Sequence, residues 1–389
     1  MKIPDKTIPY GHQWLDDKDI AAVVEVLKSD WLTQGPKVQE FETALAKFVG
    51  AKYAVVVNSG TAALHAAYFA AGIKVGDEVI TSPITFTSTA NAALFLGARP
   101  IFIDVEPDTG NIDPDLIEDA IRPWTKAIIP IHFGGHPVRL AKIQKIAKEH
   151  DLLVIEDACH ALGAWYGKKK IGNCQYSDLA AFSFHPVKSI TTGEGGAVIT
   201  NSEEFYRKLL MFRKHGMLTN SLVSDKWWYE MHFLGYNYRL TDFQCALGLS
   251  QLRKLPAFIR KRAQIARIFE KRFRGNDYFD LPKEKDYAKS AWHLYPIRLK
   301  NQYRKQRNQI FAQLRRNKLG VQIHYIPVYW HPYYQKLGYR RGICPAAEDF
   351  FQREISLPLY PAMSGKEIKY VTDTVLKIFK KVSMNVKNR

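Results

Sequence analysis

Lys188, in a loop between two apolar runs, is the residue best placed for covalent chemistry. It lies in FSFHPVKSITTGEGGAV (182–198), after the apolar run 179–184 and before the run 196–200. A lysine taken alone is usually a solvated surface side chain. An amine held at the end of a buried strand, however, loses its proton more readily and can form an imine with an aldehyde cofactor. The GEGG that follows precedes a strand instead of opening a helix, so it is not a dinucleotide-binding fingerprint.

A carboxylate stands at the end of a second apolar run. Asp157 closes LLVIED (152–157) and is followed by Ala158, Cys159 and His160. An aspartate in this place is commonly a turn or cap residue. In open α/β sheets, however, ligands bind beyond the carboxyl ends of the strands. Beside a pyridine nitrogen, a buried carboxylate would favour the protonated ring and make it an electron sink.

Hydroxyl and glycine residues mark a candidate phosphate site. The segment NSGTAAL (58–64) places Ser59, Gly60 and Thr61 where an apolar strand ends and a helix begins. Free N–H groups and the helix dipole favour an anion there, although the same residues also form an ordinary helix cap. No Gly-Lys-Ser/Thr follows, so this is not a Walker motif. Phe86 could stack on an aromatic cofactor ring, but an isolated phenylalanine is more often a core residue.

The elements that must position these residues are apolar runs alternating with helical patterns. Continuous apolar runs of this kind predict a mainly parallel sheet covered on both faces, with segments 61–72 and 138–150 as crossover helices. We therefore expect an α/β domain over residues 1–250, including the N-terminal segment. The runs are 54–57, 78–83, 100–105, 127–133, 152–157, 179–184 and 196–200.

The pattern changes after residue 250. Apolar residues recur at helical spacing from about Cys245 to Arg274, which predicts a long basic helix leading out of the first domain. Strand-like segments at 293–299 and 321–327, with helical segments at 308–319 and 365–381, then predict a compact α+β unit. We expect residues 251–389 to form this linking helix and the smaller second domain.

Length and composition are those of a globular protein. The chain has 389 residues, of which 46% are hydrophobic and 24% charged, which excludes disordered, collagen-like and small disulfide-rich classes. Its formal charge of +18 lies in the C-terminal part: residues 251–389 carry +21 and residues 1–250 carry −3. A nucleic-acid partner would use such charge, but the charges are dispersed rather than clustered. A multiply charged anionic substrate explains them equally well.

Cysteines and hydropathy predict a soluble cytoplasmic protein rather than a secreted or membrane protein. Cys159, Cys174, Cys245 and Cys344 are scattered and form no metal-binding spacing, so we expect reduced thiols and no metal site. No stretch reaches the roughly 20 apolar residues of a membrane helix, and the first residues lack a signal-peptide core.

Together the motifs closely resemble the DegT family of sugar-nucleotide aminotransferases. The resemblance implies an α/β fold, the aspartate aminotransferase-like fold type I of pyridoxal-phosphate enzymes, with a large α/β/α domain, a mainly parallel sheet and a smaller C-terminal α+β domain. It covers nearly the whole chain, in order, through LTQG (32–35), NSGTAAL (58–64), SPITFTSTANA (82–92), EDACHALGA (156–164), FSFHPVKSITTGEGGAV (182–198), RKHGM (213–217), GYNYRLTDFQCALGLSQL (235–252) and VQIHYIP (321–327).

The resemblance implies a role in cofactor binding for several positions. Lys188 is the lysine that bonds to pyridoxal 5'-phosphate and moves the proton between the cofactor and sugar C4. Asp157 would pair with the pyridine nitrogen, and His160 would lie near the phenolic oxygen. Phe86 would stack on the ring, and the phosphate would be held by a set that includes Ser59 in its helix cap together with Gly60, Thr61 and Ser183. Cys159 stands where the family commonly has alanine, a small change.

Further positions are implied to reach the partner subunit or the substrate. Asn237, in the matching GxNxR motif, would reach the phosphate of the partner's cofactor, which implies a homodimer with shared active sites. Arg239 and Glu194 fall in matching motifs without an assigned contact. The sugar-nucleotide pocket would be lined by Tyr10, by the loop Asp30, Trp31, Leu32 and Thr33, and by Gln322, Ile323, His324 and Tyr325.

The implied activity is transfer of an amino group from L-glutamate to C4 of a UDP-linked 4-keto-6-deoxy-N-acetylhexosamine. The motifs SITTGEGG, ALGLSQL, HLYPI and VQIHYIPVY are most similar to the branch of the family that serves pseudaminic acid synthesis. A related dehydratase branch has histidine in place of Lys188, so the lysine favours transamination. The alternatives are another 4-keto or 3-keto nucleotide sugar linked to dTDP, GDP or UDP, and a non-catalytic DNA-binding regulator.

Overall fold

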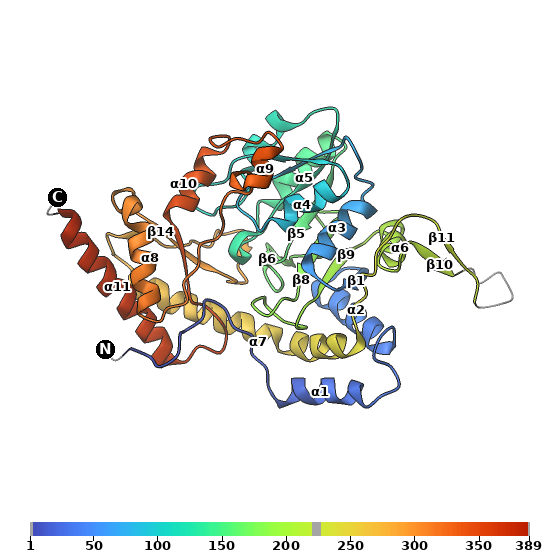
Figure 1. The fold of residues 1–389 in the computed structure, drawn as a ribbon, viewed down its shortest axis with the longest axis horizontal. Helices are drawn as coiled ribbons and strands as arrows, with labels where there is room; N and C mark the ends of the chain where they lie inside the picture. Colours follow the sequence, from blue (N-terminus) through green and yellow to red (C-terminus); the bar gives the residue numbers. More distant parts are fainter. Residues whose placement is uncertain (1–2, 220–226, 388–389) are drawn as a thin grey trace.

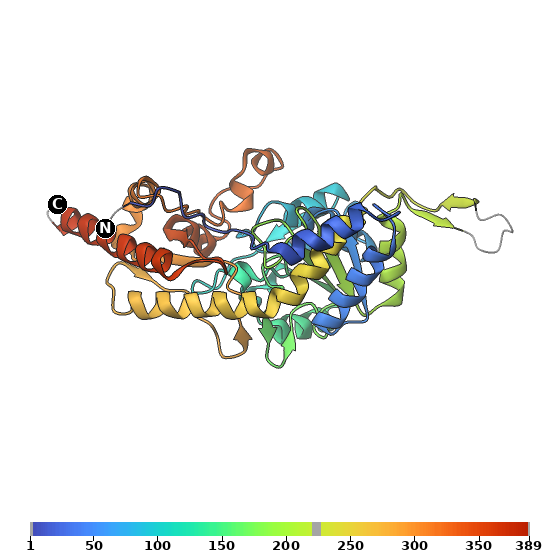
Figure 2. The ribbon, with the colours of Figure 1, turned by 90° about the horizontal axis from the view of Figure 1, so that it is seen from below.

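A central sheet and a smaller second body, bridged by one long helix, make up the chain (Figure 1). The computed structural model describes residues 3–219 and 227–387. The long helix, α7 (Asp242–Phe273), runs along the length of the molecule and joins both bodies (Figure 2). At 32 residues it is about 48 Å long.

The central sheet has seven strands in the order β1-β9-β8-β5-β4-β2-β3. β9 pairs antiparallel with both of its neighbours, and the other strand pairs are parallel. Each apolar run expected to form a strand does so, and the sheet is mainly parallel as predicted. The strands are β1 (Tyr53–Val57), β2 (Glu78–Thr81), β3 (Arg99–Phe102), β4 (Thr125–Ile129), β5 (Leu153–Asp157), β8 (Leu179–Ser183) and β9 (Gly196–Thr200).

Alternate residues of the inner strands and of β1 belong to separate cores on the two faces of the sheet. In β1, Ala54 and Val56 pack with α2 (Pro36–Val49), α5 (Leu140–Glu149) and the first half of α7. Val55 and Val57 pack on the other face with α3 (Gly60–Ala70), α4 (Ser88–Phe95) and α6 (Glu203–Phe212). Both faces are therefore covered, which explains why the strands read as continuous apolar runs.

The second body has its own hydrophobic core. An antiparallel sheet of β12 (Phe279–Asp280), β14 (Tyr295–Leu299) and β15 (Glu354–Leu357) packs with α8 (Arg307–Arg316), α11 (Gly365–Lys387) and the second half of α7. Ile8, from the N-terminal segment, also lies in this core. The boundary expected at residues 250 and 251 falls inside α7.

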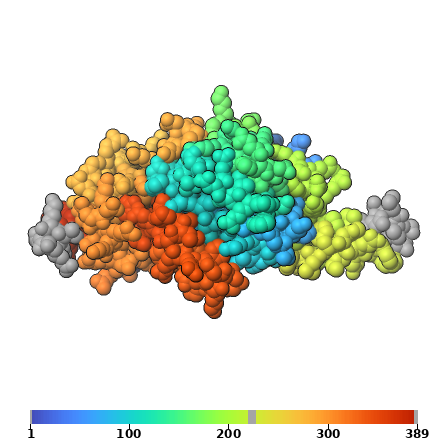
Figure 3. All heavy atoms as spheres, turned by 90° about the horizontal axis from the view of Figure 1, so that it is seen from above, coloured from blue at the N-terminus to red at the C-terminus, as the bar shows by residue number. Residues whose placement is uncertain are grey.

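Three further helices and two small sheets complete the described chain. None of its helices is long and apolar enough to cross a membrane. The hairpin β10-β11 stands out from one end of the molecule (Figure 3). The elements are α1 (Asp17–Leu27), α9 (Pro332–Lys336), α10 (Pro345–Arg353), the sheet β13-β6-β7 (Ala288–Lys289, Trp165–Tyr166, Lys169–Lys170) and the hairpin β10-β11 (Met217–Thr219, Tyr229–Met231).

The segment 321–327, expected to be a strand, forms no regular strand. Gln322 and Ser356 form an isolated bridge, with Ser356 N–H donating to Gln322 O at 2.8 Å. Two residues on, the N–H of His324 donates to the side chain of Glu354 instead of to a backbone carbonyl. The ladder with β15 therefore stops after one bridge.

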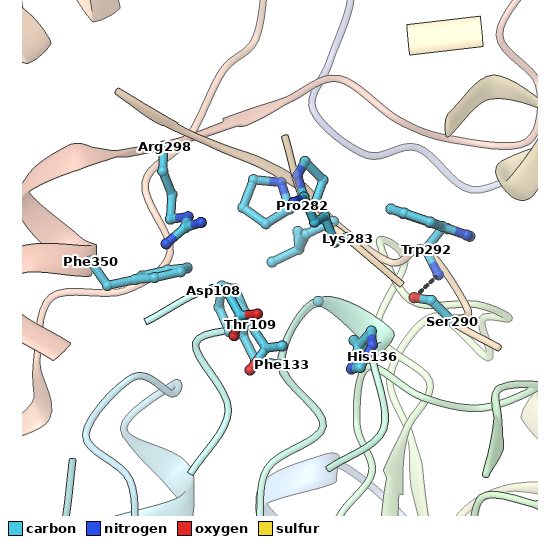
Figure 4. A pocket seen from close by; sticks show the side chains of 13 residues that line it. Asp108, Thr109, Phe133, His136, Pro282, Lys283, Ser290, Trp292, Arg298 and Phe350 are labelled. Carbon is cyan, nitrogen blue, oxygen red and sulfur yellow. Dashed lines mark hydrogen bonds between the residues drawn. The ribbon is translucent and has the colours of Figure 1, made fainter. Parts of the chain in front are cut away.

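A small cavity of about 30 Å³ marks the seam between the two bodies (Figure 4). Asp108 and His136 line it from the loops around the central sheet, and Arg298 lines it from β14. The Arg298 guanidinium lies 6.0 Å from the ring centroid of Phe350, and Ser290 Oγ accepts from the Trp292 N–H at 3.0 Å. Arg298 also donates to the carbonyl of Pro107, which links β14 to the loop that follows β3.

Asp242 ties the start of α7 to the start of α2. The N-cap of α2, Gly35, has no side chain to satisfy the first N–H groups of that helix. The buried carboxylate of Asp242 accepts instead from the N–H groups of Gly35 at 2.8 Å and Lys37 at 3.0 Å. A carboxylate at a helix N-terminus is also favoured by the helix dipole.

Replacing this carboxylate should weaken the large domain. We expect Asp242→Ala to lower the free energy of unfolding by about 2 kcal/mol, because two half-buried N–H groups at the start of α2 lose their acceptor. Asp242→Asn keeps one acceptor oxygen and should cost about half as much. Urea denaturation followed by circular dichroism measures both, and equal midpoints for Asp242→Ala and the parent chain would contradict this role.

Candidate active site

One cavity of about 650 Å³ gathers most of the residues singled out in the sequence. It lies at the carboxyl ends of β5 and β8 and at the N-terminus of α3, the edge of an open α/β sheet where ligands bind. Eleven of the predicted site residues line it: Tyr10, Ser59, Gly60, Thr61, Phe86, Asp157, His160, Ser183, Lys188, His324 and Tyr325.

The N-terminus of α3 forms one end of the cavity. Ser59 is the N-cap, and its Oγ accepts from the N–H of Ala62 at 3.0 Å. Gly60 allows the helix to approach β8 closely, because a Cβ there would lie 2.7 Å from the Ser183 Cβ and 3.0 Å from its Oγ. The first turn, with Thr61 and the Ser183 hydroxyl beside it, is suited to a phosphate group.

Asp157 is a nearly buried carboxylate at the end of β5. Thr89 Oγ1, from α4, donates to its Oδ2 at 2.6 Å, and the N–H of Cys159 donates to its Oδ1 at 3.2 Å. Thr85 Oγ1 lies 2.7 Å from Thr89 Oγ1 and completes a short chain of hydroxyl groups. The bonds fix the carboxylate, and its remaining lone pairs can accept from a protonated ring nitrogen.

Lys188 lies on the loop after β8, and its side chain enters the same cavity. Burial lowers the pKa of its ammonium group, while the nearby Cys159 and Asp157 act in the opposite direction. The side chain keeps some contact with the open cavity. An amine of lowered pKa that is reachable by a ligand has the properties that imine chemistry requires.

Aromatic and imidazole rings form a further part of the cavity wall. Tyr325 OH lies 3.2 Å from His160 Nε2, and the two rings are stacked with centroids 6.1 Å apart. Phe86 meets Tyr325 edge-on at 6.4 Å and is 60% exposed, so its face is open to an occupant. Burial lowers the pKa of His160 well below its usual value, and the charge of Lys188 adds a smaller effect in the same direction. This imidazole is therefore neutral near pH 7.

His293 is a cavity residue that the sequence analysis missed. Its ring lies 4.3 Å from that of His160, centroid to centroid. Among the described residues, the Nδ1 atoms of both rings are buried without a hydrogen-bond partner. The motif HLYPI contains His293, but a histidine at the start of an apolar strand carries no signal of a site.

A buried arginine positions His293. Arg262, on α7, donates from Nη1 to the carbonyls of Trp292 at 3.2 Å, His293 at 3.4 Å and Leu359 at 2.9 Å. Trp292, the residue before His293, has a φ of 50°, a left-handed conformation that is uncommon for residues other than glycine. Burial lowers the pKa of Arg262 to about 10, so the guanidinium stays charged at neutral pH.

Several predicted residues lie outside the cavity lining. Asp30, Trp31, Leu32 and Thr33 are exposed, and the Leu32 carbonyl accepts from the Asp242 N–H. Gln322 lies in the bridge with Ser356, and Ile323 packs against the core between the two bodies.

Asn237 is also exposed and lies beside the rim. Its carbonyl accepts from Asn58 Nδ2 at 3.3 Å. Arg239 lines a separate cavity of about 240 Å³ with Arg213 and Lys214. Within one chain, the GxNxR motif therefore does not enter the site.

Other lining residues had no predicted role. Cys159 follows Asp157 and Glu194 lies in the GEGG motif, and both had been noted without a contact. The remaining ones are hydroxyl, apolar and imidazole residues whose types alone are common on any surface, namely Asn58, Thr85, Ser88, Ile131, His185 and Val187.

Comparison with known proteins identifies the family. Residues 13–376 match the DegT/DnrJ/EryC1/StrS aminotransferase family. The chain belongs to this family. The predictions of an aminotransferase and of the aspartate aminotransferase-like fold type I are confirmed.

Three similar proteins illustrate the relationship. The UDP-4-amino-4,6-dideoxy-N-acetyl-beta-L-altrosamine transaminase of Campylobacter jejuni (strain 81-176) is 45% identical over 379 residues, 96% of this chain and 98% of that protein. Helicobacter pylori PseC, an aminotransferase involved in the biosynthesis of pseudoaminic acid, has a TM-score of 0.92 at 39% identity and covers 97% of this chain and 100% of its own. The PLP-form of the putative sugar aminotransferase Spr1654 from Streptococcus pneumoniae has a TM-score of 0.91 at 30% identity, covering 97% and 99%.

The cavity fits the pyridoxal phosphate on which this family depends. The space beside Gly60 is one that a Cβ would fill. The first turn of α3 supplies N–H donors for a phosphate. Asp157 stands at the other side with free lone pairs, and the orphan Nδ1 of His160 is a buried polar atom in need of a partner. Lys188 would supply the amine.

Removing the Arg262 guanidinium should destabilise the protein and disturb His293. We expect Arg262→Met to lower the free energy of unfolding by about 2–3 kcal/mol, since three carbonyls lose a charged donor. Arg262→Lys, which can satisfy some of these carbonyls, should lose less. Urea denaturation at pH 7 compares the variants. A urea midpoint of Arg262→Met at or above that of the parent chain would contradict the stabilising role of Arg262.

Proposed function

We propose that this enzyme transfers the amino group of L-glutamate to C4 of a UDP-linked 4-keto-6-deoxy-N-acetylhexosamine. The product would be UDP-4-amino-4,6-dideoxy-N-acetyl-β-L-altrosamine, for pseudaminic acid synthesis. Bound pyridoxal phosphate and a homodimer with shared active sites are parts of the proposal.

The observation that carries the proposal is that three chemical groups with different roles lie around one cavity. An amine of lowered pKa, Lys188, lies with a fixed carboxylate, Asp157, and a helix N-terminus at Gly60. These are the groups needed to bond an aldehyde, to stabilise a protonated ring nitrogen and to bind a phosphate. Beside them the cavity leaves room for a substrate.

Each residue has a separate task in the proposed reaction. Pyridoxal phosphate, when bound, supplies the electron sink for the substrate's bonding electrons. The α3 N-terminus and Ser183 would hold its phosphate, and Asp157 would keep its ring nitrogen protonated. His160, fixed by Tyr325, would donate to or accept from the phenolic oxygen.

Lys188 is the residue that moves the proton. Freed from the cofactor, its amine would take a proton from the donor carbon and return one to C4 of the sugar. Its lowered pKa leaves a larger fraction of the amine unprotonated and able to act as a base. Because Lys188 approaches from one wall of the cavity, delivery from that side would set the new stereocentre.

The substrate assignment is supported by named relatives and by room in the cavity. Proteins 39–45% identical to this chain carry the name UDP-4-amino-4,6-dideoxy-N-acetyl-beta-L-altrosamine transaminase. Tyr10, His324 and Tyr325 line the part of the cavity on the side of the second body. They are placed to contact a sugar nucleotide, and Tyr325 also reaches His160 at the cofactor end.

The dimer proposal is supported by exposed apolar side chains near the GxNxR motif. Around it, Met231 is 63% exposed and Leu234 is 73% exposed. Trp31, 57% exposed, lies in the loop next to the start of α7. Apolar groups gathered in this way mark an interaction surface. A partner packed there would cover them and bring the exposed Asn237 toward the other chain's cofactor.

Both half-reactions can be followed in one spectrophotometric experiment. We expect a visible cofactor band when pyridoxal phosphate is added, its loss with L-glutamate, and its return with UDP-2-acetamido-2,6-dideoxy-β-L-arabino-hexos-4-ulose. Lys188→Ala should lower turnover by a factor of at least about 100 without unfolding the protein, because the covalent and proton-transfer groups are lost together.

The control is Lys168→Ala, which removes an exposed lysine from the turn between β6 and β7 and should behave as the parent. Loss of the band without its return would show that another keto sugar is the substrate. Parent-like turnover by Lys188→Ala would overturn the mechanism.

Shared active sites predict complementation between two inactive variants. Lys188→Ala and Asn237→Ala change groups that would meet across the dimer, so a mixed dimer would retain one intact site. Co-expression with random pairing should restore about one quarter of the parent activity. Each variant expressed alone is the control, and a mixture no more active than their mean would contradict the sharing of sites.

A further inference from the structure

A chain of three hydrogen-bonded side chains lies behind His324. Ser356 Oγ lies 2.8 Å from His324 Nδ1 and also contacts Glu354 Oε1. The other carboxylate oxygen, Glu354 Oε2, accepts from the His324 N–H at 2.8 Å. His324 itself lines the cavity that holds Lys188. The chain thus runs from a carboxylate in the second body to an imidazole in the active site.

Burial limits the hydrogen bonds that these three side chains can form. Glu354 and Ser356 are fully buried on β15, and His324 is 7% exposed. A hydroxyl has one proton to donate, so Ser356 can donate to Glu354 or to His324, but not to both. Nδ1 is engaged by Ser356, which leaves Nε2 as the ring nitrogen that can reach an occupant of the cavity.

The direction of the bonds follows from the protonation of Glu354. With an ionised carboxylate, Ser356 donates to Glu354 and must accept from a protonated Nδ1, so Nε2 presents a lone pair. With a protonated carboxyl, Glu354 donates to Ser356, which donates to Nδ1, and Nε2 then carries the proton. One proton on Glu354 therefore reverses the hydrogen-bonding character of His324.

We propose that Glu354 and Ser356 are positioning residues that set the tautomer of His324, and that the protonated form of Glu354 makes Nε2 a donor to the nucleotide sugar. The part that concerns the sugar rests on the function proposed above. The part that concerns the tautomer depends on the protein alone.

The surroundings of Glu354 bring its pKa close to neutral pH. Burial raises its pKa to about 8, against the smaller opposing effects of the bonds from Ser356 and His324 and of the Arg307 charge. Arg298 pairs with Glu354 in register on β14 but extends to the Pro107 carbonyl, and the neutral phenol of Tyr325 lies near the carboxylate.

His324 stays neutral while Glu354 titrates. Burial and the Lys188 charge lower the pKa of His324 to about 3. The change between pH 7 and pH 9 is therefore one of tautomer and not of charge. Below pH 8 the Nε2–H form should dominate, and above pH 8 the Nδ1–H form. A nucleotide sugar is rich in acceptor oxygens, so the Nε2–H form should bind it more tightly.

The tautomer can be read from long-range ¹⁵N–¹H correlation spectra of the holoenzyme labelled with ring-¹⁵N histidine. The signals of His324 are those that are absent from the spectrum of His324→Gln. We expect the protonated nitrogen to change from Nε2 to Nδ1 as pH rises from 6.5 to 9.5. Glu354→Gln should hold the Nε2–H form throughout, because its amide donates to Ser356 as a protonated carboxyl does. An unchanged tautomer in the parent enzyme would overturn the proposal.

Further variants separate the effect of the hydrogen-bonded chain from general effects on packing. Ser356→Ala should abolish the pH dependence of the tautomer, and Ser356→Thr, which keeps the hydroxyl, should restore it. Glu270→Gln makes the same chemical change at an exposed carboxylate on α7 and should titrate as the parent. A pH-dependent tautomer that persists in both Glu354→Gln and Ser356→Ala would also overturn the proposal.

Steady-state kinetics test the link to the sugar. The KM for the keto sugar should rise by about three- to tenfold between pH 7 and pH 9 in the parent, the loss of one hydrogen bond, and stay level in Glu354→Gln. A KM that rises equally in both would overturn the sugar-binding part. An absence of sugar turnover in the parent would instead reject the proposed function, while the tautomer measurement still stands or falls by itself.

Discussion

The chemistry proposed for this site depends on keeping the amine of Lys188 out of bulk water. Removal from water favours the neutral amine, and the neighbouring Asp157 and Cys159 limit how far its pKa falls. Asp157 is itself fixed by Thr89 and by a backbone N–H, so its charge is held at a defined place. The balance needs the carboxyl ends of β5 and β8 to lie side by side, which the parallel pairing of these strands provides.

Much of this arrangement could be predicted because it depends on local sequence and on sheet topology. Apolar runs gave all seven strands of the central sheet, and residues that follow such runs gather at one edge of a parallel sheet. Asp157, Lys188 and the cap at Ser59 could be found for this reason. The alternation of Ala54 and Val55 between two cores shows that the strand pattern is a consequence of burial on both faces.

Residues that depend on distant contacts could not be found in this way. His293, just before β14, enters the cavity because Arg262, on helix α7, holds its backbone. The segment 321–327 has the composition of a strand, yet it leaves the ladder because Glu354 captures the N–H of His324. In each case, a buried polar side chain overrides the local preference. Asn237 could be assigned only by resemblance, since within one chain it stays outside the cavity.

The distribution of protons in the cavity follows from the same burial. His160, His293 and His324 all have pKa values lowered by desolvation, and the Lys188 charge adds to the effect on each. Among the lining residues that the structure describes, Lys188 is the one lysine or arginine. These three buried imidazoles can therefore donate or accept hydrogen bonds near neutral pH but cannot hold a second proton. In the proposed reaction, Lys188 would therefore be the cationic side chain of the cavity that carries the proton between two carbon atoms, and the side from which it approaches would set the configuration of the product.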